Sequence, residues 1–233
     1  MDKEGFKLTT LSPLKPSDIP PEEAIIASGK KILDASESWR QGKTYHGIVK
    51  TFSRPKGPGD GGGWHCRVSE HKPSEASFDQ MWGKLGKDNA LSEVQFIPDL
   101  KIATKIKDIS STASIWSLTF KLSFPFSPRV YTVLQVVHYK DELPRSGIVV
   151  SVPIDLSSPS DIELAQLEGQ GVQGRYVVVE RIMEMENGNT EWRMATTGTA
   201  GGNIPQIFVE QTMASQVSED VPNFMRWLHG LSK

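Results

Sequence analysis

The sequence predicts an α+β fold in which a long C-terminal helix lies across a β-sheet, with another helix near the N-terminus. Three patterns carry this prediction. Apolar residues recur every three or four positions over about 20–39, and again over 203–231, as in amphipathic helices. Between these segments, several runs either alternate polar with apolar residues or are rich in Val and Ile, which is typical of strands.

The size and the single cysteine favour one domain held by packing. The chain has 233 residues, enough for a substantial core in a single domain spanning 1–233. Its lone cysteine, Cys66, excludes an internal disulfide and a multi-cysteine metal cage. We therefore expect no metal and no cofactor.

The charge and the hydropathy argue against nucleic acid and against an integral membrane segment. The chain has 26 basic and 28 acidic residues and no long run of Lys or Arg that would follow phosphates. No stretch reaches the roughly 20 apolar residues of a membrane span, and the first residues lack the apolar core of a signal peptide. We expect a cytoplasmic protein whose oligomeric state the sequence leaves open.

The N-terminal part consists of a polar arm over 1–19 and a helix from Pro20 to about Trp39, in which proline and acids form the first turn. The glycine- and proline-rich segment 53–63 is expected to be a mobile loop. A phosphate-binding glycine loop would lead into a helix, whereas the residues after 63 have a strand pattern. Nucleotide binding is therefore not expected.

The middle of the chain reads as strands with short helical interruptions. A strand is expected from residue 64, a short helix at 77–82 with Ser77 as its cap, and strands near 116–122, 131–139 and 147–154. The segment 156–174 breaks the strand pattern with a short helix and several glycines. We expect a lid-like connection there.

The clearest local prediction is a β-hairpin over 175–197. Asn187-Gly188 between two strand-like runs favours a two-residue type I′ turn, in which both central residues have positive φ. This turn would set Glu180 opposite Ala195 and diagonally beside Arg193 on one face of the sheet. The other face would carry Arg181, Met183, Trp192 and Met194.

The segment 203–231 has the longest apolar stripe of the chain. The stripe passes through Val209, Met213, Val217, Val221, Phe224, Leu228 and Leu231. Such a helix should lie across the sheet. Pro222 has no backbone N–H and crowds the preceding turn, so we expect a kink or a break near it.

Short motifs add a family resemblance. Trp192-Arg193-Met194-Ala195-Thr196-Thr197, Gly201-Gly202-Asn203-Ile204-Pro205 and Val221-Pro222-Asn223-Phe224-Met225 resemble the last strand, the junction and the final helix of steroidogenic-acute-regulatory-related lipid-transfer (START) domains. Further matches are Trp64-His65-Cys66-Arg67, Phe126-Ser127-Pro128-Arg129 and Gly174-Arg175-Tyr176-Val177-Val178-Val179-Glu180-Arg181. The resemblance spans about 64–230 and is nearest to a fungal subfamily with no assigned function. Where many START domains have Arg-Asp, this chain has Arg129-Val130, so no role is carried over from that acid.

The resemblance implies a helix-grip (START/Bet v 1-like) fold, in which a curved antiparallel β-sheet wraps the long C-terminal helix and leaves a deep cavity between them. Relatives on this scaffold include aromatic polyketide cyclases and dehydratases, so the fold does not separate a carrier from an enzyme. We predict a binder of a hydrophobic small molecule such as a lipid, a sterol or a polyketide-like metabolite. The alternative is a cofactor-free polyketide cyclase or dehydratase of secondary metabolism, and a third interpretation is an interaction scaffold with a filled core.

The candidate catalytic residues are Glu180, Arg193, His65, His71 and His138. Inside a cavity, Glu180 and Arg193 could orient a ligand oxygen or stabilise an enolate, while the plain alternative is a cross-strand ion pair. The histidines titrate near neutral pH and could carry a proton, although an ordinary structural histidine explains each of them as well. A zinc site formed by His65, Cys66 and His71 is not expected, because His65 and Cys66 are adjacent on a strand and point to opposite faces.

The candidate ligand-binding residues are mostly aromatic or Met side chains that could stack on a flat ligand. They are Trp82, Trp116, Phe120, Arg129, Trp192, Met194 and Met213. Core packing explains the aromatic and Met members equally well.

Overall fold

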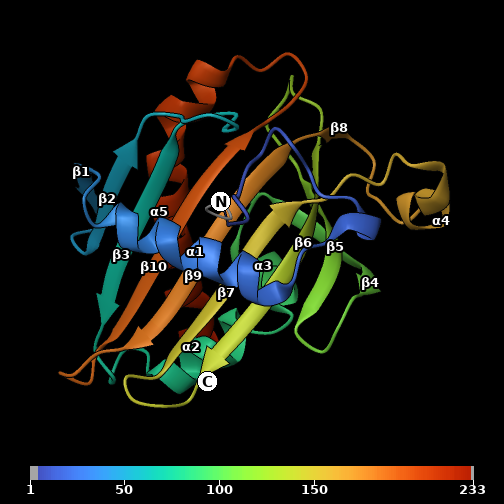
Figure 1. Ribbon diagram of the computed structural model, residues 1–233. Helices are drawn as coiled ribbons and strands as arrows, with labels where there is room; N and C mark the ends of the chain where they lie inside the picture. Colours follow the sequence, from blue (N-terminus) through green and yellow to red (C-terminus); the bar gives the residue numbers. More distant parts are fainter. Residues whose placement is uncertain (1–4, 232–233) are drawn as a thin grey trace.

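The structure is a computed structural model that describes residues 5–231, so residues 1–4 of the predicted arm and residues 232–233 lie outside it. Its centre is a twisted antiparallel sheet in the order β1-β2-β3-β10-β9-β7-β6-β5-β4 (Figure 1). The short β8 (Val172–Gln173) pairs parallel with the start of β6. The other strands are β1 Arg40–Tyr45, β2 Val49–Arg54, β3 Trp64–His71, β4 Leu100–Asp108, β5 Ala113–Phe120, β6 Arg129–Lys140, β7 Ser146–Pro153, β9 Arg175–Glu184 and β10 Thr190–Thr199.

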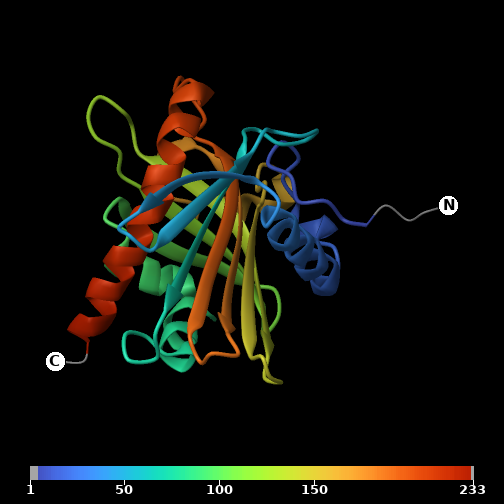
Figure 2. The same cartoon turned by 90° about the vertical axis from the view of Figure 1, so that its left-hand side faces the viewer.

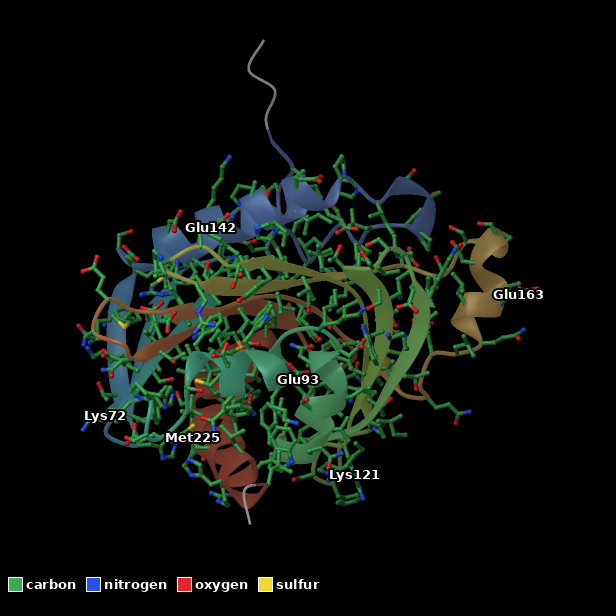
Figure 3. All side chains as sticks on the ribbon, turned by 90° about the horizontal axis from the view of Figure 1, so that it is seen from below. Lys72, Glu93, Lys121, Glu142, Glu163 and Met225 are labelled. Atoms are coloured by element: carbon green, nitrogen blue, oxygen red, sulfur yellow. The ribbon has the colours of Figure 1, made fainter. Side chains whose placement is uncertain are left out.

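Helices cover both faces of this sheet. Helix α1 (Glu22–Ser36) lies on one face, and α5 (Gln206–Gly230) lies on the other (Figure 2). Seen from below, the sheet arches over α5 and over the short helices α2 (Phe78–Leu85) and α3 (Asn89–Phe96) (Figure 3). Two 3₁₀ turns (Pro16–Asp18 and Pro159–Asp161) and α4 (Ile162–Ala165) complete the fold. The predicted α+β helix-grip architecture is confirmed.

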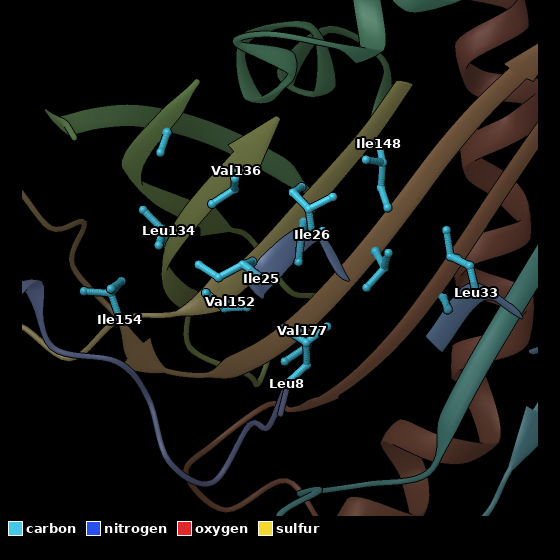
Figure 4. Packing of buried hydrophobic residues seen from close by; sticks show 14 of the residues in the cluster. Leu8, Ile25, Ile26, Leu33, Leu134, Val136, Ile148, Val152, Ile154 and Val177 are labelled. Carbon is cyan, nitrogen blue, oxygen red and sulfur yellow. The ribbon is translucent and has the colours of Figure 1, made fainter. Parts of the chain in front are cut away.

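The larger apolar core lies between α1 and the outer face of the sheet (Figure 4). Ile25 and Leu33 of α1 are fully buried there against β-branched residues of β7 and β9. Gly29 allows this close approach, since a Cβ at that position would lie 2.7 Å from Cγ2 of Val150. The absence of a side chain at Gly29 therefore lets α1 sit directly on the sheet.

A second core joins α5 to the inner face. Phe224 of α5 is fully buried, with its ring centroid 5.1 Å from Trp192 and 5.3 Å from Phe96. The break considered at Pro222 does not occur, because α5 continues through this residue to Gly230. Burial of Val221 and Phe224 on either side of the proline offsets the backbone hydrogen bond that it removes.

The predicted hairpin forms, but its predicted register is wrong by one residue. The N–H of Met185 donates to the carbonyl of Asn189, and Gly188 adopts a φ of 80°, so three residues, 186–188, form the loop. Glu180 therefore pairs with Met194, and Arg193 pairs with Arg181. A tertiary contact supports this longer loop, since Nδ2 of both Asn187 and Asn189 donates to Glu70 on β3.

The glycine-rich segment 53–63 and the connection 156–174 contact different parts of the fold. The glycine-rich loop is tied to its surroundings, because the N–H of Gly61 donates to Thr10 and the N–H of Gly63 donates to Glu210 on α5. In the connection 156–174, Leu164 and Ala165 pack against the core beneath α1. None of its residues lines the cavity described below.

Candidate functional site

A cavity of about 540 Å³ lies between the inner face of the sheet and α5. Its walls come from β3, β5, β6, β9, β10, α2, α3, the α3–β4 connection and α5. Much of the lining is apolar or aromatic: Leu85, Phe96, Ile97, Pro98, Phe120, Leu122, Tyr131, Tyr176, Val178, Trp192, Met194, Val209, Met213 and Val217. The α5 helix thus spans the hollow of the sheet without filling it.

The strand register decides which side chains line this cavity. Because side chains alternate along a strand, Trp192, Met194 and Thr196 of β10 point inward together. On β9 the same alternation places Tyr176, Val178 and Glu180 in the wall. In the predicted register, Glu180 shares its face with Arg193 and Ala195. The one-residue difference in the hairpin places it instead on the same face as Trp192 and Met194.

Three aromatic rings cluster at one end of the cavity. The ring centroid of Tyr131 lies 5.1 Å from that of Tyr176 and 5.5 Å from that of Phe120. Burial raises the pKa of both tyrosine hydroxyls, so both stay protonated at neutral pH. This end offers flat apolar faces to a ligand.

A buried guanidinium marks a polar part of the wall. Arg67 of β3 is 1% exposed, and its Nη2 lies 3.3 Å from Oε1 of Glu180 and 3.8 Å from Oδ2 of Asp220. Trp192 supports this pair twice: its Nε1 donates to Glu180 at 2.6 Å, and its ring lies 4.0 Å beneath the guanidinium. Nε and Nη1 of Arg67 are buried with no hydrogen-bond partner among the described residues.

Further carboxyl groups surround this pair. Burial raises the pKa of Glu93 on α3 to about 8, and the negative charges of Glu180 and Asp220 contribute to the rise against the opposing effect of Arg67. Burial likewise raises the pKa of Asp220 on α5 to about 7. Burial also raises the pKa of Glu180, although Arg67 and the Trp192 N–H oppose it. The cavity therefore holds carboxyl groups that change protonation near neutral pH.

The predicted pair of Glu180 and Arg193 is not brought together. Glu180 lines the cavity, whereas Arg193 lies on the opposite face of the sheet beneath α1. There its Nε and Nη2 donate to both carboxylate oxygens of Glu191, and its Nη1 donates to Ser36 of α1 at 3.1 Å. Arg193 thus ties α1 to the sheet and does not face the cavity.

None of the three predicted histidines lines the cavity. Strand β3 is unbroken and places His65, Arg67 and His71 on one face, while Cys66 points to the core beneath α1. His71 is buried beside Trp192 with its Nε2 2.9 Å from the hydroxyl of Ser69, and burial lowers its pKa. Burial also lowers the pKa of His65, while His138 is exposed on β6.

Four of the seven predicted ligand-binding residues line the cavity: Phe120, Trp192, Met194 and Met213. The other three do not. Trp82 stacks on Tyr139 outside the cavity, and Trp116 is buried in the core beneath α3. Arg129 donates to the backbone carbonyls of Ala200 and Ser127 and so ties two neighbouring loops together.

The sequence interpretation missed the polar groups that lie beside Glu180. Glu93 comes three residues after the buried Ala90, and Asp220 comes three after Val217 and four before Phe224. Both acids thus occupy positions on otherwise apolar helix faces. A carboxyl group within an apolar stripe was the signal that could have identified them.

A metal site of clustered ligands and a membrane-spanning helix each have structural requirements that the described part of the chain does not meet. Within residues 5–231, no group of three His, Cys, Asp or Glu side chains is arranged to hold a metal ion. No described helix is both long enough and apolar enough to cross a bilayer.

The fold is similar to solved structures of lipid-transfer domains. Human StAR-related lipid transfer protein 5 matches with a TM-score of 0.73 and 14% identity, over 91% of this chain and 96% of that chain. Human STARD10 matches with a TM-score of 0.73 and 9% identity, over 91% of this chain and 80% of that chain. A STAR-related lipid transfer protein from Xanthomonas axonopodis matches with a TM-score of 0.64 and 18% identity, over 82% of this chain and 98% of that chain. At such low identities, these likenesses show the START-like fold.

Sequence comparison identifies the family. No curated protein matches the chain. One family model matches residues 64–228, which is well over half of the chain and includes the strands and the helix that form the cavity. The protein therefore belongs to the family described as Protein of unknown function (DUF3074).

Proposed function

We propose that the protein binds a hydrophobic small molecule, of lipid, sterol or polyketide type, in the cavity between the sheet and α5. The observation that carries this proposal is a hollow of about 540 Å³ with a largely apolar and aromatic lining. A ligand that loses about 300 Å² of apolar surface to such walls gains roughly 7 kcal/mol before the costs of association. Relatives of similar fold that are named as lipid-transfer proteins support the proposal.

The cavity itself argues against a pure interaction scaffold. A scaffold without a ligand needs no such hollow, and the apolar walls of an unfilled hollow remain in contact with water. A ligand that fills the space covers those walls. Fungal origin and a role in secondary metabolism remain predictions from the resemblance.

The first test is to fill the cavity from two sides. In the variant Val178→Trp with Met213→Trp, both new side chains occupy the ligand space, since both positions line the cavity. We expect saturable binding of the uncharged dye Nile Red to the wild-type protein and a loss of affinity of about tenfold or more in the variant. Nile Red fluorescence titration measures both, and native mass spectrometry of protein taken directly from cells shows whether a natural ligand is bound.

The matched control is Gln211→Trp, which adds the same side chain to an exposed position of α5 outside the cavity lining. It should bind the dye as the wild-type protein does. Circular dichroism confirms that each variant is folded. Equal dye binding by the filled and wild-type proteins would contradict the proposal.

A second candidate function is a cofactor-free polyketide cyclase or dehydratase. The specific observation is that the pKa values of Glu93 and Asp220 lie near neutrality, as suits a general acid or base. One ionised carboxylate would remove a proton beside a substrate carbonyl, and Arg67 would stabilise the resulting enolate. A protonated carboxyl would then give its proton to the leaving hydroxyl, so that water departs and a C=C bond forms.

Absorbance measurements on a hydroxylated polyketide test this second candidate. If the protein is such an enzyme, aromatisation exceeds the rate in buffer, and Glu93→Gln lowers it by about 100-fold. The surface variant Glu163→Gln on α4 should keep the full rate. A wild-type rate equal to that of buffer would count against catalysis while leaving the binding proposal intact.

A further inference from the structure

The cavity wall contains far more acidic than basic groups. Among the described residues that line it, Arg67 is the one Lys or Arg side chain. The acidic side chains in the same lining are Glu93, Asp99, Glu180, Glu219 and Asp220. Glu180 lies nearest to the guanidinium, so the charge of Arg67 is already largely matched. Glu93 and Asp220 remain as excess acid within a largely apolar space.

Arg67 supplies an independent sign that a polar ligand atom belongs here. Its side chain is 1% exposed, yet Nε and Nη1 have no hydrogen-bond partner among the described residues. Leaving buried donors unpaired is costly. Neither nitrogen is open to the cavity in the ligand-free fold, so a ligand oxygen would satisfy these N–H groups after a small shift of the side chains around Arg67.

Together, these contacts specify a head group with two parts. We infer that the cavity selects amphiphiles whose apolar chain lies against the aromatic wall and whose head carries a protonated amine beside a hydroxyl or carbonyl oxygen. The amine would donate to Glu93 and Asp220, and the oxygen would accept from Arg67. An anionic head would be repelled by the ionised forms of these carboxyl groups, and a neutral head would form no ion pair with them. This inference rests on the proposed function and refines its ligand class.

Proton release is the signature of such a ligand. Glu93 faces Glu180, Asp220 and Arg67, and it also raises the pKa of Tyr176. Asp220 faces Arg67, Glu180 and its neighbour Glu219. Because the pKa values of Glu93 and Asp220 are about 8 and about 7, both are partly protonated near neutral pH. An ammonium group binds the ionised forms, so binding expels protons and tightens as the pH rises from about 6 to about 8.

The test compares four probes with the same twelve-carbon chain: dodecylamine, its vicinal amino alcohol, dodecanol and dodecanoic acid. Isothermal titration calorimetry at about pH 7 should rank the amino alcohol first and the amine next, about tenfold tighter than the alcohol, with the acid weakest. Repeating the titration in two buffers of different ionisation enthalpy counts the protons released. Release with the amines and none with the alcohol is the expected result.

Glu93→Gln combined with Asp220→Asn should remove both the amine preference and the proton release while dodecanol still binds. Glu163→Gln, on the surface helix α4 (Figure 3), should preserve both. The inference is overturned if dodecanol or dodecanoic acid binds as tightly as the amines, or if amine binding releases no protons. If the wild-type protein binds neither the probes nor Nile Red, the proposed function itself fails, and the two failures are therefore distinct.

Discussion

Replacing Arg67 with methionine is expected to destabilise the protein by about 3 kcal/mol at neutral pH. The substitution keeps the apolar stem but removes the charge that lies 3.3 Å from Glu180 and the cation that stacks on Trp192. Glu180 is only 5% exposed, so its carboxylate would stay buried with the Trp192 N–H as its remaining donor. Urea unfolding followed by circular dichroism measures the loss.

The double variant Arg67→Met with Glu180→Gln separates the ion pair from simple packing. Removing both charges should recover much of the stability, because no uncompensated charge remains buried. Arg145→Met is the matched control, since Arg145 also pairs with two carboxylates, Asp79 and Glu184, but lies nearer to solvent, where ion pairs contribute less. An Arg67→Met protein that unfolds at the same urea concentration as the wild type would refute the importance of the pair.

Replacing Glu93 with glutamine is expected to stabilise the ligand-free protein, by about 2 kcal/mol near pH 8. The pKa of Glu93 is raised from 4.5 to about 8 in the folded state. Between those two values the folded chain holds a proton that the unfolded chain has released, so the wild-type stability falls as the pH rises. Glutamine has nearly the same shape and cannot ionise, so it removes this penalty.

Urea unfolding at several pH values tests the sign as well as the size of this effect. The stability gained by Glu93→Gln should be largest above about pH 8 and should vanish towards about pH 4. The exposed Glu163→Gln should follow the wild-type curve throughout. A gain that is constant over the whole range would show that ionisation of Glu93 is not its cause.

The two stability predictions concern groups that the ligand proposals also use. A cavity that holds excess acid at a cost to the ligand-free fold can recover that cost when a complementary ligand binds. The stability gain in Glu93→Gln and the loss of amine preference when Glu93 and Asp220 are both replaced would therefore be two measurements of one property. Together they would show that the site is arranged for a ligand at the expense of stability.

Sequence patterns predicted the elements well where local chemistry is strong. The capping box at Ser77 and Gln80 forms at the start of α2 as the cap residue indicated. The stripe from Val209 to Leu228 forms one helix, even though Pro222 interrupts its hydrogen bonds. In both cases the deciding interactions lie within a few residues or along one apolar face.

The hairpin shows where local chemistry was insufficient. Asn187-Gly188 correctly located a turn, but contacts from Glu70 on the neighbouring strand accompany a three-residue loop. That single-residue change moves Arg193 to the far face and brings Glu180 beside Trp192 and Met194. When a site is predicted from paired strand positions, an error of one residue in the register places the wrong side chains on the shared face.

The sequence by itself determined the fold class, the helix that crosses the sheet and a supply of apolar side chains for a cavity, because periodicity reports which face of each element is buried. Only the tertiary structure decided which polar groups meet inside. Arg67, Glu93, Glu180 and Asp220 come from β3, α3, β9 and α5, and no local pattern relates them. Their protonation depends on burial and on each other's charge, which arise only when these distant segments pack together.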